Sequence, residues 1–402
     1  MLKNIISRKD SFILSLLRIW LLVDCLNGFF LNSGIDIPIS RIYKPFIAML
    51  IILGHKENYK ISSCGIISAL YLLFWCFFIF LADSNIGESL SLMLKPITTL
   101  LIFLFFRYLF ISYNNDKVLK EFIKILKVNA IVLCVNILLG LFNIGYHSYE
   151  GEGEMGFCGF FNSPNELSGV VAVIFPMVLT YFKVNRSLVQ YFLSILLLAV
   201  VAVLLSTKSP IIILFLSTAL VSYFYGSRLE KRLVILSSCI IAFAIFTYIQ
   251  ILLDAEFGVM QRLSFFIEKN GFWDAITSGR WGYWEERGVD YYNADLINQI
   301  FGLGGNRTVE MDPFDVLLNC GVIGLIFLFI LYIKMLCFPM HKINIFKHAV
   351  LISNSLLVFL SILSGHIFFS SMAGMFIAMS NSLLFYKTSF YGNKNKKGSY
   401  YF

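Results

Sequence analysis

The stretch LVQYFLSILLLAVVAVLLSTKSPIIILFLSTALVSYFY, residues 188–225, decides the fold class of this chain. It holds two long apolar runs, Leu188–Ser206 and Ile211–Tyr225, which are separated only by a short polar turn. An α-helix needs about 20 predominantly apolar residues to cross the hydrocarbon core of a bilayer. Runs of this order, joined by so short a turn, predict two antiparallel membrane helices.

The rest of the chain has the same character. Of its 402 residues, 58% are hydrophobic and only 14% are charged, whereas soluble domains are about 25% charged. This composition excludes a water-soluble core and predicts an all-α polytopic membrane protein. The first apolar run is followed by many others, so it is expected to be a membrane span rather than a cleaved signal peptide. The eight cysteines have no disulfide or metal-site spacing.

Hydropathy predicts about twelve transmembrane helices. Their predicted limits are Phe12–Leu31, Ile37–Gly54, Ile61–Leu81, Leu90–Ser112, Phe122–Phe142, Glu166–Phe182, Leu188–Ser206, Ile211–Tyr225, Leu233–Leu253, Phe314–Phe338, His348–Leu363 and His366–Tyr386. The whole chain, residues 1–402, is expected to form a single membrane domain. Residues 387–402 then form a Lys-rich cytoplasmic tail.

Basic residues give an independent prediction of orientation. With the N-terminus in the cytoplasm, most of the 32 Lys and Arg residues fall in cytoplasmic loops or in the two terminal segments. Cytoplasmic loops of membrane proteins carry such an excess of cations. Both termini are therefore expected to be cytoplasmic. The net charge of +8 could suggest nucleic acid, but in a membrane protein the side on which the cations lie matters more than their sum, so no nucleic-acid partner is expected. The longest polar segment, residues 254–312 between the ninth and tenth helices, is then extracytoplasmic.

That outer segment carries two arginines suited to an anionic ligand. Long loops inside a compact domain are usually functional. Arg280 and Arg287 are seven residues apart, so on a helix they share one face with Trp284 between them. The guanidinium fork binds phosphate oxygens with two parallel hydrogen bonds. Simple salt bridges to Glu285 and Glu286 are the alternative.

Four further cations lie at predicted outer helix ends: Arg41, Lys44, Lys95 and Lys208. Lys208 occupies the turn of the opening stretch, where a charge at membrane depth usually marks a ligand, a partner or a pathway. The ordinary alternative for all four is a side chain that extends to the lipid headgroups. For Arg41, Lys44 and Lys95 we favour this alternative over anion binding.

Two other outer segments hold polar residues beside a helix start. Asn165, in Asn162-Ser163-Pro164-Asn165-Glu166, is expected to cap the sixth helix. Glu310 and Asp312 directly precede the tenth helix, where an acid can cap the helix or deprotonate a substrate hydroxyl. The tryptophans of the long segment, such as Trp281 and Trp284, suit either a membrane-interface belt or a platform for sugar rings.

These segments, in this order, resemble the O-antigen polymerase and O-antigen ligase superfamily of bacterial membrane glycosyltransferases. The matching pieces are Gly159–Asn165, Ser206–Ser209, Ser278–Arg280 with Trp284, Phe301–Gly305, and Glu310–Asp312 followed by Gly321–Gly324. Two departures stand out: Lys208 replaces a frequent arginine, and Glu310-Met311-Asp312 stands where ligases usually have a histidine. The acidic motif makes the chain more similar to Wzy-type polymerases than to ligases.

The resemblance implies a GT-C-like membrane fold and an enzyme that needs neither metal nor other cofactor. Its partners would be polyprenyl-pyrophosphate-linked glycans in the bilayer of a bacterial cytoplasmic membrane, with a flippase and a chain-length regulator in the same pathway. It assigns pyrophosphate binding to Arg280, Arg287 and Lys208, and more weakly to Arg41 and Lys95. It assigns acid–base work to Glu310 or Asp312, while Asn165, Trp281 and Trp284 would line the glycan groove.

A transporter or flippase of lipid-linked oligosaccharides is the alternative from another class. It should show paired ionisable groups within the membrane and broken helices at its site. In this sequence most polar residues lie outside the membrane instead, which favours an enzyme.

Overall fold

A computed structural model describes most of the chain. The described residues are 5–58, 60–67, 69–70, 73, 86–149, 155–185, 187–253, 267–268, 271–277, 279–304, 308–337, 345–363 and 365–386. Most of the predicted third span, Ser278, Gly305 and the Lys-rich tail lie outside these ranges.

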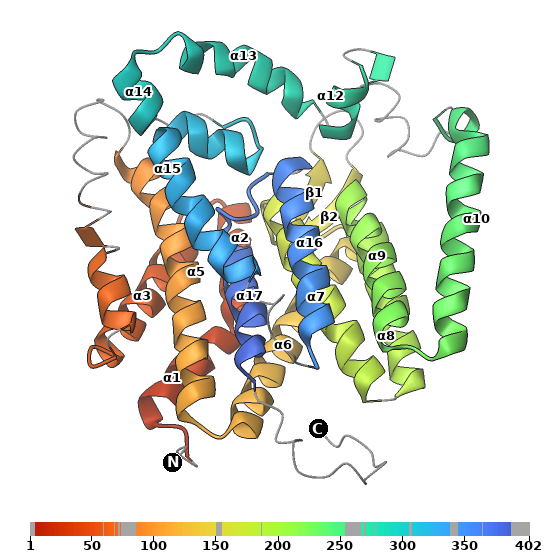
Figure 1. Ribbon diagram of the computed structural model, residues 1–402, viewed down its shortest axis with the longest axis horizontal. Helices are drawn as coiled ribbons and strands as arrows, with labels where there is room; N and C mark the ends of the chain where they lie inside the picture. The colour runs from red at the N-terminus through yellow and green to blue at the C-terminus, as the bar shows by residue number, and fades with distance from the viewer. Residues whose placement is uncertain are drawn as a thin grey trace.

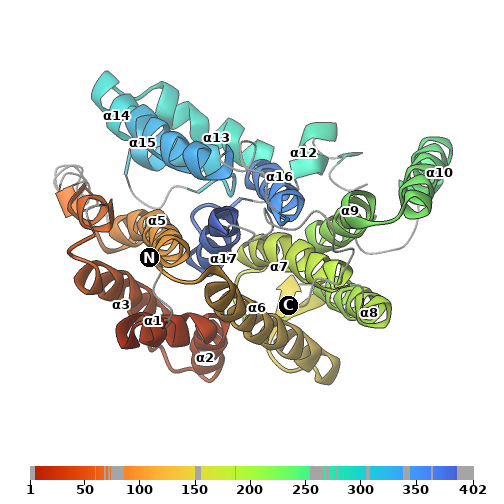
Figure 2. The same cartoon turned by 60° about the horizontal axis from the view of Figure 1, so that its bottom comes forward.

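The described chain is a bundle of long helices. In chain order these are α1 (Arg8–Arg18), α2 (Trp20–Asn32), α3 (Ile39–Gly54), α5 (Ile86–Ser112), α6 (Asn115–Leu138), α7 (Pro164–Val184), α8 (Leu188–Leu205), α9 (Lys208–Tyr225), α10 (Arg228–Leu253), α15 (Asp312–Cys337), α16 (Lys347–Leu363) and α17 (Ser371–Ser382). Short 3₁₀ helices, Leu139–Phe142 and Leu383–Phe385, follow α6 and α17. Helix α17 lies between α5 and α7 (Figure 2) and is buried along nearly its whole length.

Among the described residues, six helices are long and apolar enough to cross a membrane: α5 over residues 94–112, α6 with the 3₁₀ turn after it, α7, α8, α9, and α15 over residues 312–330. Helices α1 and α2 make a seventh candidate if they are one span bent by 47°. Helices α16 and α17 are apolar but shorter. These helices are those of an all-α membrane protein, while a count of about twelve spans stays a prediction.

Three short helices form a cap across one end of the bundle (Figure 1). They are α12 (Phe272–Thr277), α13 (Arg280–Tyr292) and α14 (Leu296–Phe301), all from the long polar segment. A small apolar core joins the cap to the start of α15 and is made of Trp284, Tyr291, Val309, Met311 and Leu318. The described beginning of α1 and the end of α17 lie at the opposite end of the bundle (Figure 1).

A two-stranded antiparallel hairpin was not expected from the sequence. Its strands are β1 (Tyr146–Tyr149) and β2 (Met155–Gly159), and β2 precedes α7 in the chain. Gly156 and Gly159 have positive φ angles of 68° and 59°. A Cβ atom would lie 2.5 Å from the carbonyl oxygen of Leu205 at Gly156, and 2.2 Å from that of Asn136 at Gly159. These glycines therefore allow the hairpin to contact α6 and α8 closely, a tertiary requirement that local sequence does not reveal.

Helix α15 is interrupted where the cap meets the bundle. Gly321 has φ 64° and ψ −168°, outside helical geometry. A Cβ atom at this position would lie 2.3 Å from the carbonyl oxygen of Ile300 at the end of α14. The backbone N–H of Leu303 donates to the carbonyl oxygen of Leu318 at 2.8 Å across the same junction. Position 321 therefore requires glycine, both because of its backbone conformation and because a Cβ atom has no room there.

We predict that Gly321→Ala lowers the free energy of unfolding by about 1–3 kcal/mol, because alanine is strained at positive φ and collides with α14. Thermal unfolding of the purified protein in detergent measures the loss as a fall in melting temperature. Gly54→Ala is the matched control, since a Cβ atom at Gly54 has no atom within 4 Å. Equal melting temperatures for the two variants would contradict the role of Gly321.

Candidate functional site

Three elements that are far apart in the sequence meet below the cap. Arg280 is the first residue of α13, Asn165 lies in the first turn of α7, and Glu310 lies just before α15. The Nη2 atom of Arg280 lies 3.0 Å from Oε2 of Glu310 and 3.3 Å from Oδ1 of Asn165. Asn165 also donates from Nδ2 to Oε2 of Glu310 at 3.2 Å. These three side chains, which form a closed triangle of hydrogen bonds, are called the triad below.

Arg280 is held by its backbone surroundings as well as by the triad. Its Nη1 atom donates to the carbonyl oxygens of Thr277 at 3.0 Å and of Leu363 at 3.4 Å. The side chain is only 12% exposed. Its Nε–H is buried and has no hydrogen-bond partner among the described residues. An arginine fixed in this way keeps one donor for a further acceptor.

The expectation that Asn165 caps α7 is wrong. The capping residue is Ser163, whose Oγ accepts the N–H of Glu166 at 3.4 Å, and Pro164 opens the helix. Proline at the first helical position is a common start because that N–H needs no partner. The helix therefore begins two residues earlier than predicted, and the amide of Asn165 is available for Arg280 and Glu310.

Glu310 is the accessible carboxylate of the triad, with 44% of its side chain exposed. Its φ angle is 61°, which is uncommon for a residue other than glycine. The α16–α17 turn packs directly on its backbone: a Cβ atom at Gly365 would lie 1.8 Å from the Glu310 carbonyl oxygen. A carboxylate that is exposed and is fixed beside a guanidinium has the access that a general base requires.

Asp312 occupies a different environment from Glu310, and its carboxylate does not cap α15, the helix that it begins. It is 3% exposed. Its Oδ2 atom accepts the N–H groups of Ile367 at 2.9 Å and of Phe368 at 2.8 Å, both in the turn between α16 and α17. The Asp312 carboxylate therefore fixes that turn against α15. Of the two acids singled out from the sequence, only Glu310 is accessible.

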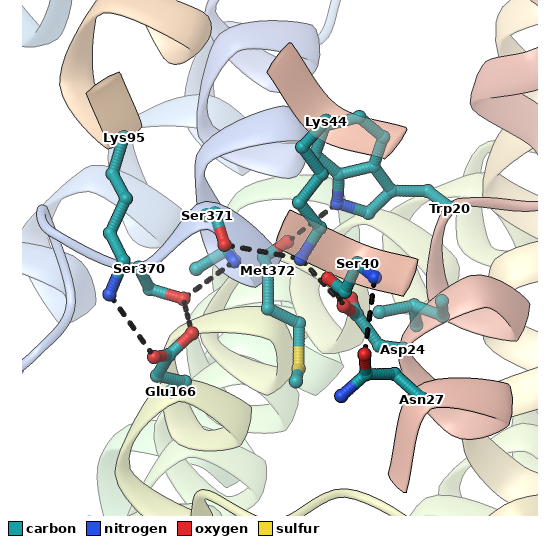
Figure 3. Close-up of polar contacts among 12 residues, drawn as sticks. Trp20, Asp24, Asn27, Ser40, Lys44, Lys95, Glu166, Ser370, Ser371 and Met372 are labelled. Carbon is teal, nitrogen blue, oxygen red and sulfur yellow. Dashed lines mark hydrogen bonds and ion pairs between the residues drawn. The ribbon is translucent and has the colours of Figure 1, made fainter. Parts of the chain in front are cut away.

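A second polar network lies close to the triad inside the bundle (Figure 3). Glu166 follows Asn165, accepts a hydrogen bond from Ser370 Oγ at 2.7 Å, and lies 3.8 Å from Lys95 Nζ. Lys44 Nζ donates to Asp24 at 2.6 Å and to Ser371 at 3.1 Å. The neighbouring serines 370 and 371 connect the two ion pairs through the start of α17.

The location of Lys44 corrects the expectation that it extends to lipid headgroups. Lys44 is 4% exposed, and its ammonium pairs with Asp24. The Nζ atom lies 5.3 Å from the centre of the Trp20 ring. A buried charge is tolerated only when it is paired and hydrogen-bonded. The partner lies twenty positions earlier in the sequence, on the neighbouring helix α2, so helix spacing within one span did not reveal it.

The remaining predicted cations are distributed over different elements. Arg287 lies two turns along α13 from Arg280, with its guanidinium 5.7 Å from the centre of the Tyr283 ring. Lys208 is the first residue of α9, and Arg41 is exposed in the first turn of α3. Of the cations assigned to pyrophosphate, Arg280 belongs to the triad and Lys95 pairs with the residue that follows Asn165.

The two tryptophans differ in exposure. Trp284 is 8% exposed and packs on Phe314 with ring centres 4.2 Å apart, so it holds α13 on α15. Trp281 is half-buried and donates from Nε1 to Glu285 at 2.8 Å. Of the two rings, Trp281 is the more available to a ligand.

Sequence reasoning missed Glu166 and His366. Glu166 was quoted in the Asn162–Glu166 motif, and its position next to Asn165 was the available signal. His366 was treated as the first residue of a span, but it lies in the α16–α17 turn with φ 55°. Nothing in the local sequence shows that this turn contacts α15.

Comparison with known protein families, with characterised proteins and with solved structures finds no match to this chain. The chemistry must therefore be argued from the site itself. The triad and the adjacent Glu166–Lys95 pair combine an accessible carboxylate with two cations at one end of an apolar bundle. Such a site can bind an anionic group and accept a proton from a hydroxyl beside it.

We predict that Asp312→Asn lowers the stability of the fold, whereas Glu310→Gln changes it little. Asparagine at 312 has one carbonyl oxygen and points a donor toward backbone donors, which should lower the free energy of unfolding by about 1–3 kcal/mol. Glutamine at 310 removes charge from an exposed side chain and should leave the melting temperature nearly unchanged. Thermal unfolding in detergent compares the two variants. A larger loss for Glu310→Gln would show that the two acids have been given the wrong roles.

Proposed function

We propose that this chain is a bacterial membrane glycosyltransferase that joins polyprenyl-pyrophosphate-linked oligosaccharide units into a surface polysaccharide. The supporting observation is the triad: Asn165, Arg280 and Glu310 come from separate motifs of the polymerase resemblance and contact one another within 3.3 Å. The three motifs are far apart in the sequence, so their contact supports a shared role at one site. The polymer would be an O-antigen, a capsule or an exopolysaccharide.

The proposed reaction transfers a glycan between two lipid-linked molecules. A hydroxyl oxygen of the acceptor sugar attacks the anomeric carbon of the donor, and the bond from that carbon to the pyrophosphate oxygen breaks. The pyrophosphate leaves with the bonding electrons and keeps its lipid. Fixed cations that face the developing charge stabilise this departure. Arg280 supplies its guanidinium, and Lys95 supplies an ammonium on a side chain that is 28% exposed.

Glu310 accepts the proton of the attacking hydroxyl in this proposal. In the substrate-free protein its Oε2 atom accepts hydrogen bonds from Arg280 and Asn165. A pyrophosphate that bonds to Arg280 competes for the guanidinium and releases Glu310 for the acceptor. The amide of Asn165 can keep the carboxylate in position, because its donation to Oε2 does not depend on Arg280.

The proposed orientation puts the cap outside the cytoplasm. Twelve spans with both termini cytoplasmic would explain why most cations fall on one side. The described beginning of α1 and the end of α17 lie together at the end away from α12–α14 (Figure 1), which supports this arrangement. Lipid-linked donors serve a reaction on that outer face, where nucleotide sugars are not normally present.

Two features favour the second candidate, a transporter of lipid-linked oligosaccharides. The Lys44–Asp24 ion pair is buried in the bundle, and α1 and α2 are separated by a bend of 47°. Ionisable pairs and broken helices are typical of transport pathways. A ligase, which transfers a finished glycan to a different acceptor, would use the same polar site as a polymerase.

We predict that Arg280→Ala abolishes polymer while protein levels in the membrane stay normal. Arg280→Lys should restore only part of the chain length, because the ammonium keeps the charge but loses the fork. The measurement is a gel ladder of surface glycan from cells that carry each variant. The exposed Arg232 of α10 provides the matched control Arg232→Ala, which should give wild-type ladders. Wild-type chain length in Arg280→Ala would refute the assignment.

The material that accumulates without the protein separates the two functions. Loss of a polymerase leaves single lipid-linked units exposed on the outer face, where an impermeant sugar-oxidising reagent labels them. Loss of a transporter leaves the same units on the inner face, protected from that reagent until the membrane is opened. We expect labelling of intact cells or spheroplasts; protection would favour the transporter.

A further inference from the structure

A cluster of ligand-type side chains joins the start of α15 to the α16–α17 turn. Asp312, Asp315 and His366 offer carboxylate oxygens and an imidazole nitrogen that all lie within 4.8 Å of one another. Asp312 and Asp315 are 3% and 4% exposed, and His366 is half-buried. The cluster lies beside the triad without sharing a residue with it.

Among the described residues, lysine and arginine side chains do not balance the negative charges of Asp312 and Asp315. Within the described ranges, neither carboxylate forms a salt bridge to lysine or arginine, and Glu166 adds negative charge nearby. Backbone N–H groups bind Asp312, and the N–H of Val309 donates to Asp315 Oδ1 at 2.5 Å. Buried carboxylates of this kind usually pair with a cation or coordinate a metal.

The side chain of Asp315 gives a second, independent indication that this cluster binds a ligand. Its Oδ2 atom is buried and has no hydrogen-bond partner, although its Oδ1 atom is bonded. A buried carboxylate oxygen without a partner carries a free-energy cost that calls for an unseen water or ion. The nearby imidazole makes a metal ion chemically suitable, since imidazole and carboxylate together are ligands for divalent transition ions.

We propose that Asp312, Asp315 and His366 bind a divalent transition cation of the Zn²⁺ or Mn²⁺ type. Ca²⁺ and Mg²⁺ prefer sites made only of oxygen ligands, so the imidazole favours the transition ions. A tetrahedral ion with bonds of about 2.1 Å holds its ligand atoms about 3.4 Å apart, a separation that falls inside the 4.8 Å limit of this cluster. Binding would fix the α16–α17 turn to α15.

This site is independent of the proposed glycosyl transfer, because its predicted effect is on metal content and stability. It also differs from the expectation, drawn from the family resemblance, that no metal is needed. The ion would neutralise the two buried carboxylates next to the backbone of Glu310.

Metal analysis of the full-length protein tests the site. The protein, purified in detergent through a tag without histidines, is loaded with Zn²⁺ or Mn²⁺, dialysed and measured by mass spectrometry of the metals. We expect a single bound ion per chain. A chelator should remove it and lower the melting temperature, and the same ion should restore both.

Two variants connect the ion to these residues. Asp315→Asn can keep the bond from Val309, and His366→Asn keeps a residue type that tolerates positive φ, so both should fold. Each should lower metal affinity by at least about tenfold. The exposed Glu286 of α13 gives the control Glu286→Gln, which should bind like the wild type.

Background metal content in the loaded wild-type protein would overturn the proposal, and this result does not depend on how the variants fold. Wild-type affinity in both variants would equally overturn it, because the ion would then lie elsewhere. Binding of Mg²⁺ or Ca²⁺ in preference to both transition ions would contradict the assigned ligand chemistry.

Discussion

The ion pair between Arg280 and Glu310, bridged by Asn165, is the charged contact on which the candidate site depends. Few charges are available inside such a bundle, and each must find a partner. Here one arginine connects α13 with the first turn of α7 and the residue before α15. The access to Glu310 and the proposed chemistry depend on this connection, while apolar packing such as Trp284 on Phe314 also holds the cap in place.

The other charged residues at this end of the bundle follow the same constraint. Lys44 pairs with Asp24, and Lys95 lies beside Glu166. Serines at the start of α17 connect these pairs, so the buried central helix is held by polar contacts at one end and by apolar packing along its length. The charged groups of this polar layer are hydrogen-bonded to one another by the protein itself, which is the preorganisation that the proposed electrostatic catalysis requires.

Much of the fold could be predicted from the sequence, because long apolar runs leave few alternatives to membrane helices. Runs such as Leu188–Ser206 correspond to single helices within a residue or two. The hairpin β1–β2 could not be predicted, because Gly156 and Gly159 are needed only for contact with helices far away in the sequence. The break at Gly321 has the same origin, since α14 imposes it.

Sequence patterns single out residues of the candidate site but do not show which of them touch. Arg280, Glu310 and Asn165 were each chosen from local pattern, yet only tertiary structure shows that they touch. Asn165 was given a capping role because a sequence pattern does not distinguish Ser163 from Asn165 as the first non-helical residue. Asp312 was paired with Glu310 by proximity, although a helix start turns the two carboxylates into different surroundings.

We propose above all that this protein itself forms glycosidic bonds between lipid-linked units. The sharpest test incubates the purified protein in detergent with polyprenyl-pyrophosphate-linked repeat units, without nucleotide sugar, and resolves the products by gel electrophoresis. We expect a ladder of products that differ by one repeat unit, together with released polyprenyl pyrophosphate. Unchanged single units, with the protein folded and the natural repeat unit supplied, would show that this protein is not the polymerase.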